Sequence, residues 1–351
     1  MTRVGIIGCG NISRFHHEGY ANAGARIVHA ADVRIEAAQA VADRYGAKAS
    51  ADYQAVLADP EVDIVSVLTF ASTHKEICLA AIAAGKGVVC EKTLTANAAD
   101  SAEIARAAEK AGTFFATAYM KRYFPAMQKA KELLAGMGQL MTIYARSWQP
   151  AGEVWTAPLD PSQTNWPSPV VRNYGGGCLV CCGSHILDLL HWFGGRPSRI
   201  AGDLYVREGM DSDLQSNALL WFENGGIGHF EANWHPLAYA GYERNGWDER
   251  LEINAIGGRL DIYTVKWDQP ENNGALLVHQ DAKTGETTEY RYRAMNPFHA
   301  EMAEMVRRYE AGEQPMPSAW DGYVVDETIA QITNSSATKT VVEVKWADRE
   351  S

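Results

Sequence analysis

The sequence predicts an α/β protein of two domains: a doubly wound parallel sheet, followed by an α+β domain with an open-faced, mainly antiparallel sheet. Short apolar runs alternate with alanine-rich helical stretches up to about residue 121. Beyond residue 136 the runs are longer, alternate with polar residues and are rich in aromatic side chains. A chain of 351 residues also exceeds what one hydrophobic core usually serves. We therefore expect domains at residues 1–121 and 122–351.

Five apolar runs of the first domain have the continuous hydrophobicity of buried parallel strands. They cover residues 3–8, 26–32, 62–68, 87–90 and 113–118. The stretches between them predict helices at residues 12–23, 34–45, 74–84 and 98–111. Strand and helix thus alternate as a doubly wound sheet requires.

The second domain combines alternating strands with a few helices. Strands are predicted at residues 139–148, 217–222, 226–234 and 250–256. Helices are predicted at residues 183–193, from residue 297 onward, and at 321–335 after Ser318 as N-cap. Residues 148–173 contain several prolines and little periodicity, and so long a loop in a compact domain is usually functional.

The charge balance argues against two classes of partner. Lys and Arg number 32 against 43 Asp and Glu, a formal net charge of −11, which repels phosphate backbones and anionic membrane surfaces. No apolar run approaches the roughly 20 residues that span a bilayer, and the N-terminus leads into a strand without a signal-peptide region. We expect no nucleic-acid or membrane partner and a cytoplasmic protein, whose six dispersed cysteines are reduced thiols.

A glycine-rich turn follows the first predicted strand. In the segment Gly8-Cys9-Gly10-Asn11-Ile12, Gly8 permits a tight turn, and Gly10 permits close approach of a pyrophosphate to the start of the next helix. The following strand ends at Asp32, about 20 residues on, as the dinucleotide fingerprint requires. The sequence therefore predicts a Rossmann domain that binds a dinucleotide, whereas the glycines alone would also fit an ordinary turn.

Two residues bear on the choice of dinucleotide. The Asp32 carboxylate accepts hydrogen bonds from a ribose diol and repels a 2′-phosphate, which favours NAD. Arg34 could instead hold a 2′-phosphate by bidentate contacts. We expect NAD and keep NADP as the alternative.

Several segments match one family in order along the chain. They are Gly5–Gly10, Thr69–His74, Ala84–Leu94, Tyr119–Pro125 and Gly175–Leu179, with His185 and Asp188 after them. Together with residues 298–309 and the Ser335 region, they resemble the glucose-fructose oxidoreductase, inositol dehydrogenase and rhizopine catabolism (Gfo/Idh/MocA) family over nearly the whole chain. The resemblance implies a nicotinamide-binding domain, a sheet domain that carries the substrate, and hydride transfer at a secondary alcohol of a sugar or polyol.

The resemblance also implies roles for individual residues. Lys92 and His185 match the family's catalytic lysine and histidine. The residues expected at the cofactor are Gly8, Gly10, Asn11, Ile12, Asp32, Arg34, Thr69, Phe70, His74, Glu91 and Lys92. Those expected at the substrate are Lys92, Tyr119, Arg122, Trp148, Asn165, Trp166, Arg172, Cys181 and His185. Of these, Trp148, Asn165, Trp166 and Arg172 rest on loop position alone.

These residue types suit the oxidation of an alcohol. The hydroxyl proton must leave, and the developing alkoxide charge must be stabilised. We assign stabilisation and proton relay to the Lys92 ammonium, and the role of general base to His185, because histidine titrates at about pH 6.5. On a helix His185 shares a face with Cys181 and Asp188, opposite the apolar stripe, which presents it toward a cleft. Without the resemblance, a surface lysine and a core histidine would be the simpler interpretation.

Three positions depart from the family pattern. Phe70 and Thr93 stand where the family has prolines, and Cys181 stands where it commonly has aspartate. We expect a trans Lys92–Thr93 peptide, because a cis bond without proline costs roughly 2.5 to 4 kcal/mol. A neutral thiol at position 181 does not act on the histidine as a carboxylate would, so the relay runs through another group, such as Lys92, or the reaction differs.

A cluster of three cysteines and a histidine raises the question of a metal. Cys178, Cys181, Cys182 and His185 could form a tetrahedral zinc set. Two of the sulfurs are adjacent in sequence, however, and no second cysteine pair closes the site. We expect small buried hydrophobes and no metal.

The ten tryptophans, several of them on or near the second sheet, suit either a sugar ring or a subunit interface. We expect a homodimer or homotetramer that forms through the outer face of that sheet.

Besides a dehydrogenase, two functions fit the sequence. One is a redox-neutral enzyme that oxidises a sugar transiently before elimination or hydrolysis. The other is a catalytically silent NAD-binding regulator, for which the missing acid at position 181 is the reason.

Overall fold

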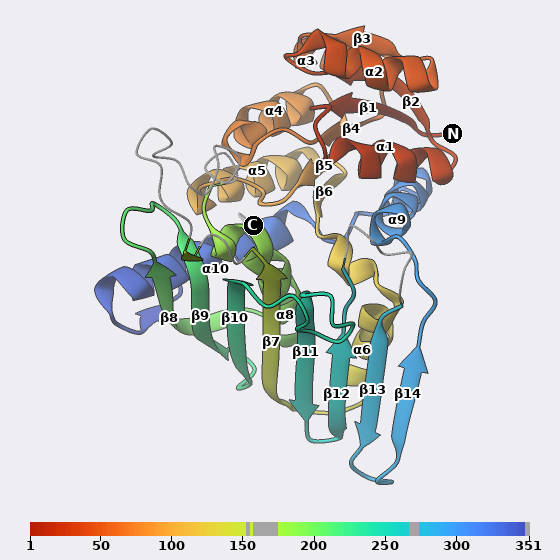
Figure 1. The fold of residues 1–351 in the computed structure, drawn as a ribbon. Helices are drawn as coiled ribbons and strands as arrows, with labels where there is room; N and C mark the ends of the chain where they lie inside the picture. The colour runs from red at the N-terminus through yellow and green to blue at the C-terminus, as the bar shows by residue number, and fades with distance from the viewer. Residues whose placement is uncertain (152–154, 157–174, 267–273, 348–351) are drawn as a thin grey trace. The chain divides into compact units, whose positions relative to one another are not determined.

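The computed structural model describes residues 1–151, 155–156, 175–266 and 274–347 (Figure 1). Within these residues the chain forms two compact units. The first contains residues 1–120, 297–326 and 347, and the second contains the described residues of 121–296 together with 327–346. None of the described helices is both long and apolar enough to cross a membrane.

The first unit is built on a six-stranded parallel sheet with the order β3-β2-β1-β4-β5-β6. Its strands are β1 (Arg3–Ile7), β2 (Arg26–Ala31), β3 (Lys48–Ser50), β4 (Ile64–Val67), β5 (Gly87–Glu91) and β6 (Phe115–Ala118). Its first five helices are α1 (Ser13–Asn22), α2 (Ile35–Tyr45), α3 (Tyr53–Ala58), α4 (Ala71–Ala83) and α5 (Ala98–Ala111). The central strands are buried at nearly every residue, as in sheets covered on both faces. The predicted doubly wound sheet is confirmed.

Two short elements, β3 and α3, are absent from the prediction. β3 has three residues, too few for a periodic signal. α3 has six, and its N-cap Asp52 accepts a hydrogen bond from the Gln54 amide at 2.9 Å. A local cap, rather than an apolar stripe, defines this helix.

A segment from the C-terminal half of the chain completes the first unit. Helix α9 (Pro297–Ala311) packs on α1, where the rings of Phe15 and Phe298 stack at 4.7 Å. A Cβ at Gly19 would lie 2.8 Å from the side chain of Met302, so glycine lets the two helices approach closely. The apolar stripe of α9 is therefore buried in the first unit, and the single division proposed at residue 121 does not include this return of the chain.

The last helix, α10 (Ala319–Thr338), begins two residues before the predicted start at residue 321. The Asp321 amide donates to Ser318 Oγ at 3.3 Å, and the Asp321 carboxylate accepts from the Ser318 amide and hydroxyl at 2.8 and 2.6 Å. This reciprocal capping confirms Ser318 as the N-cap.

The second unit carries a nine-stranded sheet with the order β14-β13-β12-β11-β7-β10-β9-β8-β15. Its strands are β7 (Leu140–Pro150), β8 (Pro197–Val206), β9 (Asp213–Phe222), β10 (Ile227–His235), β11 (Asp248–Ala255), β12 (Gly258–Tyr263), β13 (Leu276–Asp281), β14 (Thr287–Arg291) and β15 (Val342–Glu343). All neighbouring strands are antiparallel except β7 and β10, which are parallel. The predicted mainly antiparallel sheet is confirmed.

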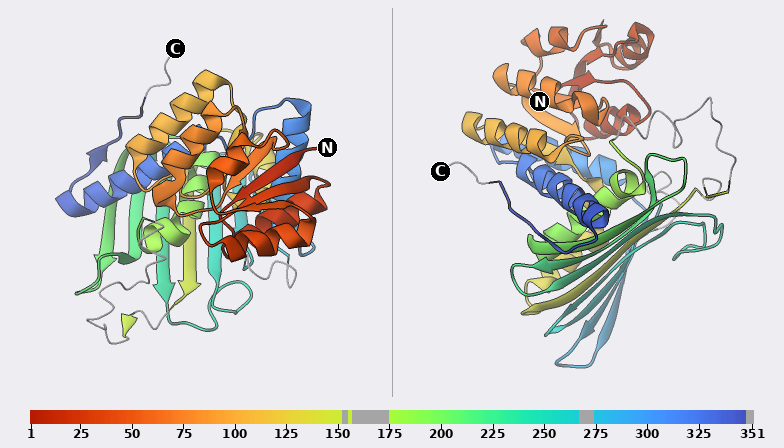
Figure 2. Two further views of the ribbon diagram at one scale, coloured as in Figure 1. Left: turned by 90° about the horizontal axis from the view of Figure 1, so that it is seen from above. Right: turned by 90° about the vertical axis from the view of Figure 1, so that its left-hand side faces the viewer.

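The two faces of this sheet differ. The inner face is covered by α6 (Pro125–Leu134), α8 (Ser184–Gly194) and the later part of α10 (Figure 2), and it buries side chains such as Ile143 and Phe230. The outer face presents Tyr144 and Arg146, and the described elements of this unit leave it uncovered.

Candidate active site

The glycine-rich turn after β1 has the geometry of a pyrophosphate cradle. Gly8 has a φ of +93°, and a Cβ there would lie 2.8 Å from the backbone of Leu68. At Gly10 a Cβ would meet no atom within 4 Å. The first turn of α1, the end of the helix with the positive dipole, follows directly. The turn therefore leaves room for the pyrophosphate of a dinucleotide.

Asp32 at the end of β2 holds this turn. Its carboxylate accepts hydrogen bonds from the Cys9 amide at 2.8 Å and the Arg34 amide at 2.9 Å. The Arg34 guanidinium lies 3.5 Å from the same carboxylate and is largely exposed. The residue expected to bind the ribose thus also tethers the arginine that could favour NADP.

The loop after β4 is held by a buried histidine. His74 Nε2 lies 3.0 Å from the Thr69 carbonyl, and Nδ1 lies 3.1 Å from the carbonyls of both Thr93 and Leu94. Burial lowers the pKa of His74, against the effect of these carbonyls. Phe70, by contrast, is exposed. The His74 ring therefore joins two loops of the first unit, and its predicted cofactor role would be exerted through them.

Glu91, the last residue of β5, is a buried carboxylate. Its Oε1 lies 3.0 Å from His16 Nε2, and its Oε2 accepts the Lys92 amide at 2.9 Å. Burial alone would raise the pKa of Glu91, but the hydrogen bond from His16 and the charge of Lys92 lower it overall. The residue before the predicted catalytic lysine is therefore ionised and fixed in place.

The Lys92–Thr93 peptide is cis, so the trans prediction is wrong. That prediction used only the intrinsic preference of a peptide bond without proline. In the folded chain, the carbonyls of Thr93 and Leu94 contact His74. Such long-range contacts do not enter an argument from local preference.

Asp326 on α10 anchors the loop that follows Lys92. Its Oδ2 accepts the Thr95 amide at 2.9 Å and the Ser101 hydroxyl at 2.6 Å, while Oδ1 has no partner among the described residues. Burial raises the pKa of Asp326 to about 7, against these two hydrogen bonds. Neither Asp326 nor His16 is predicted from the sequence.

This carboxyl group should make stability depend on pH. The pKa of Asp326 is about 7 in the folded chain, and the ordinary pKa of aspartate is about 4. Between pH 4 and pH 7 the folded chain therefore holds a proton that the unfolded chain has lost, so the free energy of unfolding falls as pH rises through this range. Asp326→Asn keeps an oxygen for both donors and removes the titration. In urea unfolding at pH 5 and pH 8, the difference in stability between the variant and the wild type should change by about 2.5 kcal/mol in favour of the variant at the higher pH. A difference independent of pH would contradict this expectation.

In the second unit, Lys121 forms a buried ion pair with Glu249 of β11. Glu249 also accepts hydrogen bonds from Ser147 Oγ at 2.5 Å and Gln149 Nε2 at 3.2 Å. Sequence reasoning missed both charged residues. Glu249 is in phase with the buried positions of its alternating strand, and this was the available signal, whereas Lys121 carries none.

Arg122, the next residue, pairs with the helix that bears His185. Its Nε and Nη2 donate to the two Asp188 oxygens at 2.9 and 2.6 Å, and both side chains are buried. Such a bidentate pair fixes orientation as well as distance. The predicted substrate residue Arg122 therefore positions α8, where Asp188 lies one turn after His185.

A π-helical turn, η4 (Leu179–Gly183), directly precedes α8, and π-helical turns are frequent at functional sites. Asp213 accepts the Leu179 amide at 2.8 Å, and burial raises the pKa of Asp213 to about 6. Cys181 in this turn is half-buried, and His185 follows in the first turn of α8. The structure thus places Cys181 in the turn before α8, His185 in the first turn of α8, and Arg122 in contact with Asp188 of the same helix.

Cys178 at the N-cap of η4, and Cys181 and Cys182 within it, do not belong to any group of three or more His, Cys, Asp or Glu side chains that could hold a metal ion among the described residues. Cys178 and Cys182 lie with their sulfurs 3.3 Å apart, and both are buried. Burial and the neighbouring thiol raise the pKa of Cys178 well above its usual value. Such buried thiols behave as small hydrophobes.

The remaining predicted substrate residues are scattered. Tyr119 is completely buried and belongs to the first unit. Trp148 lies on the outer face of the sheet, under the Arg146 guanidinium at 4.6 Å, and so on the face opposite α8. Asn165, Trp166 and Arg172 lie outside the described residues.

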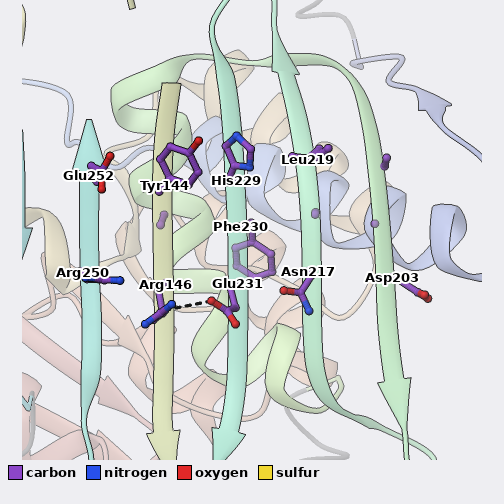
Figure 3. A pocket seen from close by; sticks show the side chains of 14 residues that line it. Tyr144, Arg146, Asp203, Asn217, Leu219, His229, Phe230, Glu231, Arg250 and Glu252 are labelled. Carbon is purple, nitrogen blue, oxygen red and sulfur yellow. Dashed lines mark hydrogen bonds and ion pairs between the residues drawn. The ribbon is translucent and has the colours of Figure 1, made fainter. Parts of the chain in front are cut away.

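The outer face contains a groove of about 610 Å³ (Figure 3). The rings of Tyr144 and His229 stack at 4.1 Å in it, and Arg146 bridges Glu231 at 3.1 Å and Asp248 at 2.9 Å. Aromatic side chains and arginine, as in this groove, are enriched at protein interfaces, whereas aspartate and glutamate are depleted there.

Two family models match the chain. The model described as "Oxidoreductase family, NAD-binding Rossmann fold" covers residues 2–119, and the GFO/IDH/MocA C-terminal domain covers residues 127–261. Inositol 2-dehydrogenase 3 of Saccharopolyspora erythraea is 26% identical over 355 residues, which cover 99% of this chain and 97% of that protein. Myo-inositol 2-dehydrogenase of Thermotoga maritima is 26% identical over 334 residues, or 91% and 92% of the two chains.

Solved structures agree on the fold. Levoglucosan dehydrogenase in complex with NADH and levoglucosan matches with a TM-score of 0.83 at 20% identity, and the match covers 98% of this chain and all of that one. The two family models together span most of the sequence. The chain therefore belongs to the Gfo/Idh/MocA family of oxidoreductases, and its first unit is the family's NAD-binding domain.

Proposed function

We propose that the protein is an NAD(P)-dependent dehydrogenase that transfers a hydride between a secondary alcohol of a sugar or polyol and nicotinamide. The observation that carries the proposal is the position of Lys92, directly after the carboxyl end of β5, with the preceding Glu91 held in place by His16. In open α/β sheets, ligands bind outside the carboxyl ends of the strands. The relatives named for inositol support the substrate class.

In this proposal, Lys92 and His185 divide the chemistry. NAD, when bound, would supply the acceptor for the hydride that leaves the carbinol carbon. The imidazole of His185 takes the hydroxyl proton, and the Lys92 ammonium stabilises the negative charge that develops on the oxygen. The Arg122–Asp188 pair holds the helix from which His185 acts.

The first test is a screen of neutral and acidic sugars and polyols with NAD and with NADP, followed at the absorbance of reduced nicotinamide. We expect net reduction with at least one polyol or sugar. Binding of substrate without net reduction, with chemical change of the sugar, would instead support the redox-neutral alternative. NAD binding without any reaction would support the silent regulator, for which Cys181 in place of the acid is the motivating observation.

NAD should bind more tightly than NADP. The Asp32 carboxylate repels a 2′-phosphate, and Arg34 is tethered to it rather than free to bind the phosphate. We expect a preference of at least about tenfold, or about 1.4 kcal/mol, by calorimetric titration. Asp32→Ala should reduce the preference, whereas Arg34→Ala should not. Equal or tighter binding of NADP by the wild type would mean that Arg34 dominates.

Cys181→Asp restores the family acid one helical turn before His185. A carboxylate there favours the imidazolium, so the pH profile of the oxidation should shift to higher pH. If the Cys181 thiol takes part in the reaction, the variant should instead lose activity, and thiol reagents should inactivate the wild type unless NAD or substrate protects it. Cys181→Ser is the matched control, since it adds no charge.

We further propose that the outer face of the nine-stranded sheet joins copies of the chain in a homodimer or homotetramer. The exposed Tyr144, its stacked partner His229 and the Arg146 network support an interface there. A monomer mass by light scattering would refute this.

All six cysteines are free thiols, in keeping with the cytoplasm as the proposed compartment.

A further inference from the structure

A buried network in the first unit reaches from α1 to the residue before Lys92. His16 Nδ1 lies 3.0 Å from Ser66 Oγ, and Nε2 lies 3.0 Å from Glu91 Oε1. His16 and Ser66 are completely buried. The second oxygen of Glu91 accepts the Lys92 amide at 2.9 Å. One carboxylate thus joins the imidazole of α1 to the backbone of Lys92.

The direction of these hydrogen bonds follows from the charge of Glu91. An ionised carboxylate only accepts hydrogen bonds, so His16 must carry its proton on Nε2 and donate it to Glu91. The other ring nitrogen, Nδ1, forms the hydrogen bond with the Ser66 hydroxyl. A buried carboxylate with both oxygens occupied has one favourable orientation, and this orientation sets the direction of the Lys92 amide.

Serine, histidine and glutamate in hydrogen-bond order are also the parts of a nucleophilic triad. That interpretation fails here, because Ser66 lies in the core strand β4 and is completely buried, so no substrate reaches its oxygen. The network acts on its one neighbour with a chemical role, Lys92.

We propose that His16 is a positioning residue, which through Glu91 couples the helix after the glycine-rich turn to the placement of Lys92. The inference rests on the proposed function, in which Lys92 stabilises the alkoxide. α1 begins at the pyrophosphate cradle, so the same helix serves the cofactor at its first turn and the lysine through His16. The hydrogen bond from His16 to Glu91 is directional, so this role requires a hydrogen-bond donor at the position of Nε2, and a side chain of the same volume without that donor would not fulfil it.

Two substitutions of His16 separate the need for a donor at Nε2 from the need for a side chain that fills the space. His16→Gln places an amide donor near the position of Nε2 and keeps the bond to Glu91. His16→Asn places its amide near Nδ1 and loses that bond. A displacement of about 1 Å in a catalytic group can cost about a hundredfold in rate. We therefore expect kcat to fall about 30-fold to 100-fold in the Asn variant and less than about fivefold in the Gln variant.

The Kd for NAD should change less than about threefold in both variants, because neither removes a cofactor contact. His17→Gln is the matched control, since His17 is buried on the same helix but contacts Tyr45 at 2.8 Å instead of Glu91. It should leave kcat unchanged. Equal losses in the Asn and Gln variants, or a loss in NAD affinity that equals the loss in kcat, would overturn the proposal.

A readout without substrate separates this inference from the proposed function. Acetylation of the lysines by acetic anhydride, mapped by peptide mass, reports the reactivity of Lys92, with Lys86 as internal reference because its ammonium binds the Asp59 and Val62 carbonyls. In His16→Asn the Glu91 carboxylate loses its hydrogen bond to residue 16 and can turn to the Lys92 ammonium, so acetylation of Lys92 should slow about threefold. In His16→Gln the acetylation rate should equal that of the wild type. This result in a protein that oxidises no sugar would keep the inference while the proposed function fails. No change in either variant would refute it.

Discussion

Replacing Lys92 with alanine is expected to lower kcat for sugar oxidation by about a thousandfold and to leave the Kd for NAD within about threefold. The ammonium interacts most strongly with the alkoxide charge of the transition state, so its loss appears in the chemical step rather than in cofactor binding. Removal of one oxyanion stabiliser elsewhere costs about 10² to 10³ in kcat. Steady-state kinetics and calorimetry of the same preparation measure the two quantities.

Lys75→Ala is the control for this experiment. Lys75 lies on α4 of the same unit and pairs with Asp100 and Glu103 at the surface, so its loss should change neither quantity. Lys92→Arg should recover part of the rate, because it keeps the charge with a different shape. A Lys92→Ala enzyme with an unchanged turnover number would remove Lys92 from the mechanism.

Replacing Glu249 with alanine is expected to destabilise the protein by about 3 to 5 kcal/mol, the cost of leaving a buried charge without its partner. Lys121 and Glu249 are almost completely buried, so water cannot take the place of the lost carboxylate. Urea unfolding, followed by the fluorescence of the tryptophans in this unit, measures the change.

A double-mutant cycle separates the charge from the packing. Lys121→Met with Glu249→Gln removes both charges and keeps similar volumes, so it should cost much less than Glu249→Ala, as in other buried ion pairs that were replaced together. If the losses from Lys121→Met and Glu249→Gln simply add, the two side chains are not coupled and the expectation is wrong.

The regular elements of the first unit were predictable because each is defined by local pattern. The predicted and observed bounds agree at 98–111 for α5, where Asn97 caps the first turn and Gly112 ends the helix with a positive φ. The location of α9 was not predictable. Its apolar stripe shows that one face is buried, but no periodicity tells that Phe298 packs on Phe15, far away in the sequence.

The candidate site shows the same division. Lys92 and His185 could be named because they lie in segments that resemble a family. His16, Lys121 and Asp326 could not, because each acts through a partner at a sequence separation of 75, 128 and 231 residues respectively. The role of a buried polar residue is identified from the group with which it forms a hydrogen bond or ion pair. For these residues that group is known only once the chain is folded.

The order of strands in the second sheet has a consequence for the evolution of this chain. β7 ends at Pro150, and β8 begins at Pro197 three positions away across β10 and β9, so the connection between them crosses the sheet and contains η4 and α8. The register of β7 is fixed by β10 and β11, and that of β8 by β9. The number of residues between Pro150 and Cys178 is therefore not dictated by strand pairing. A change in length between these two residues can therefore be inherited while β7 and β8 keep their pairing with their neighbours.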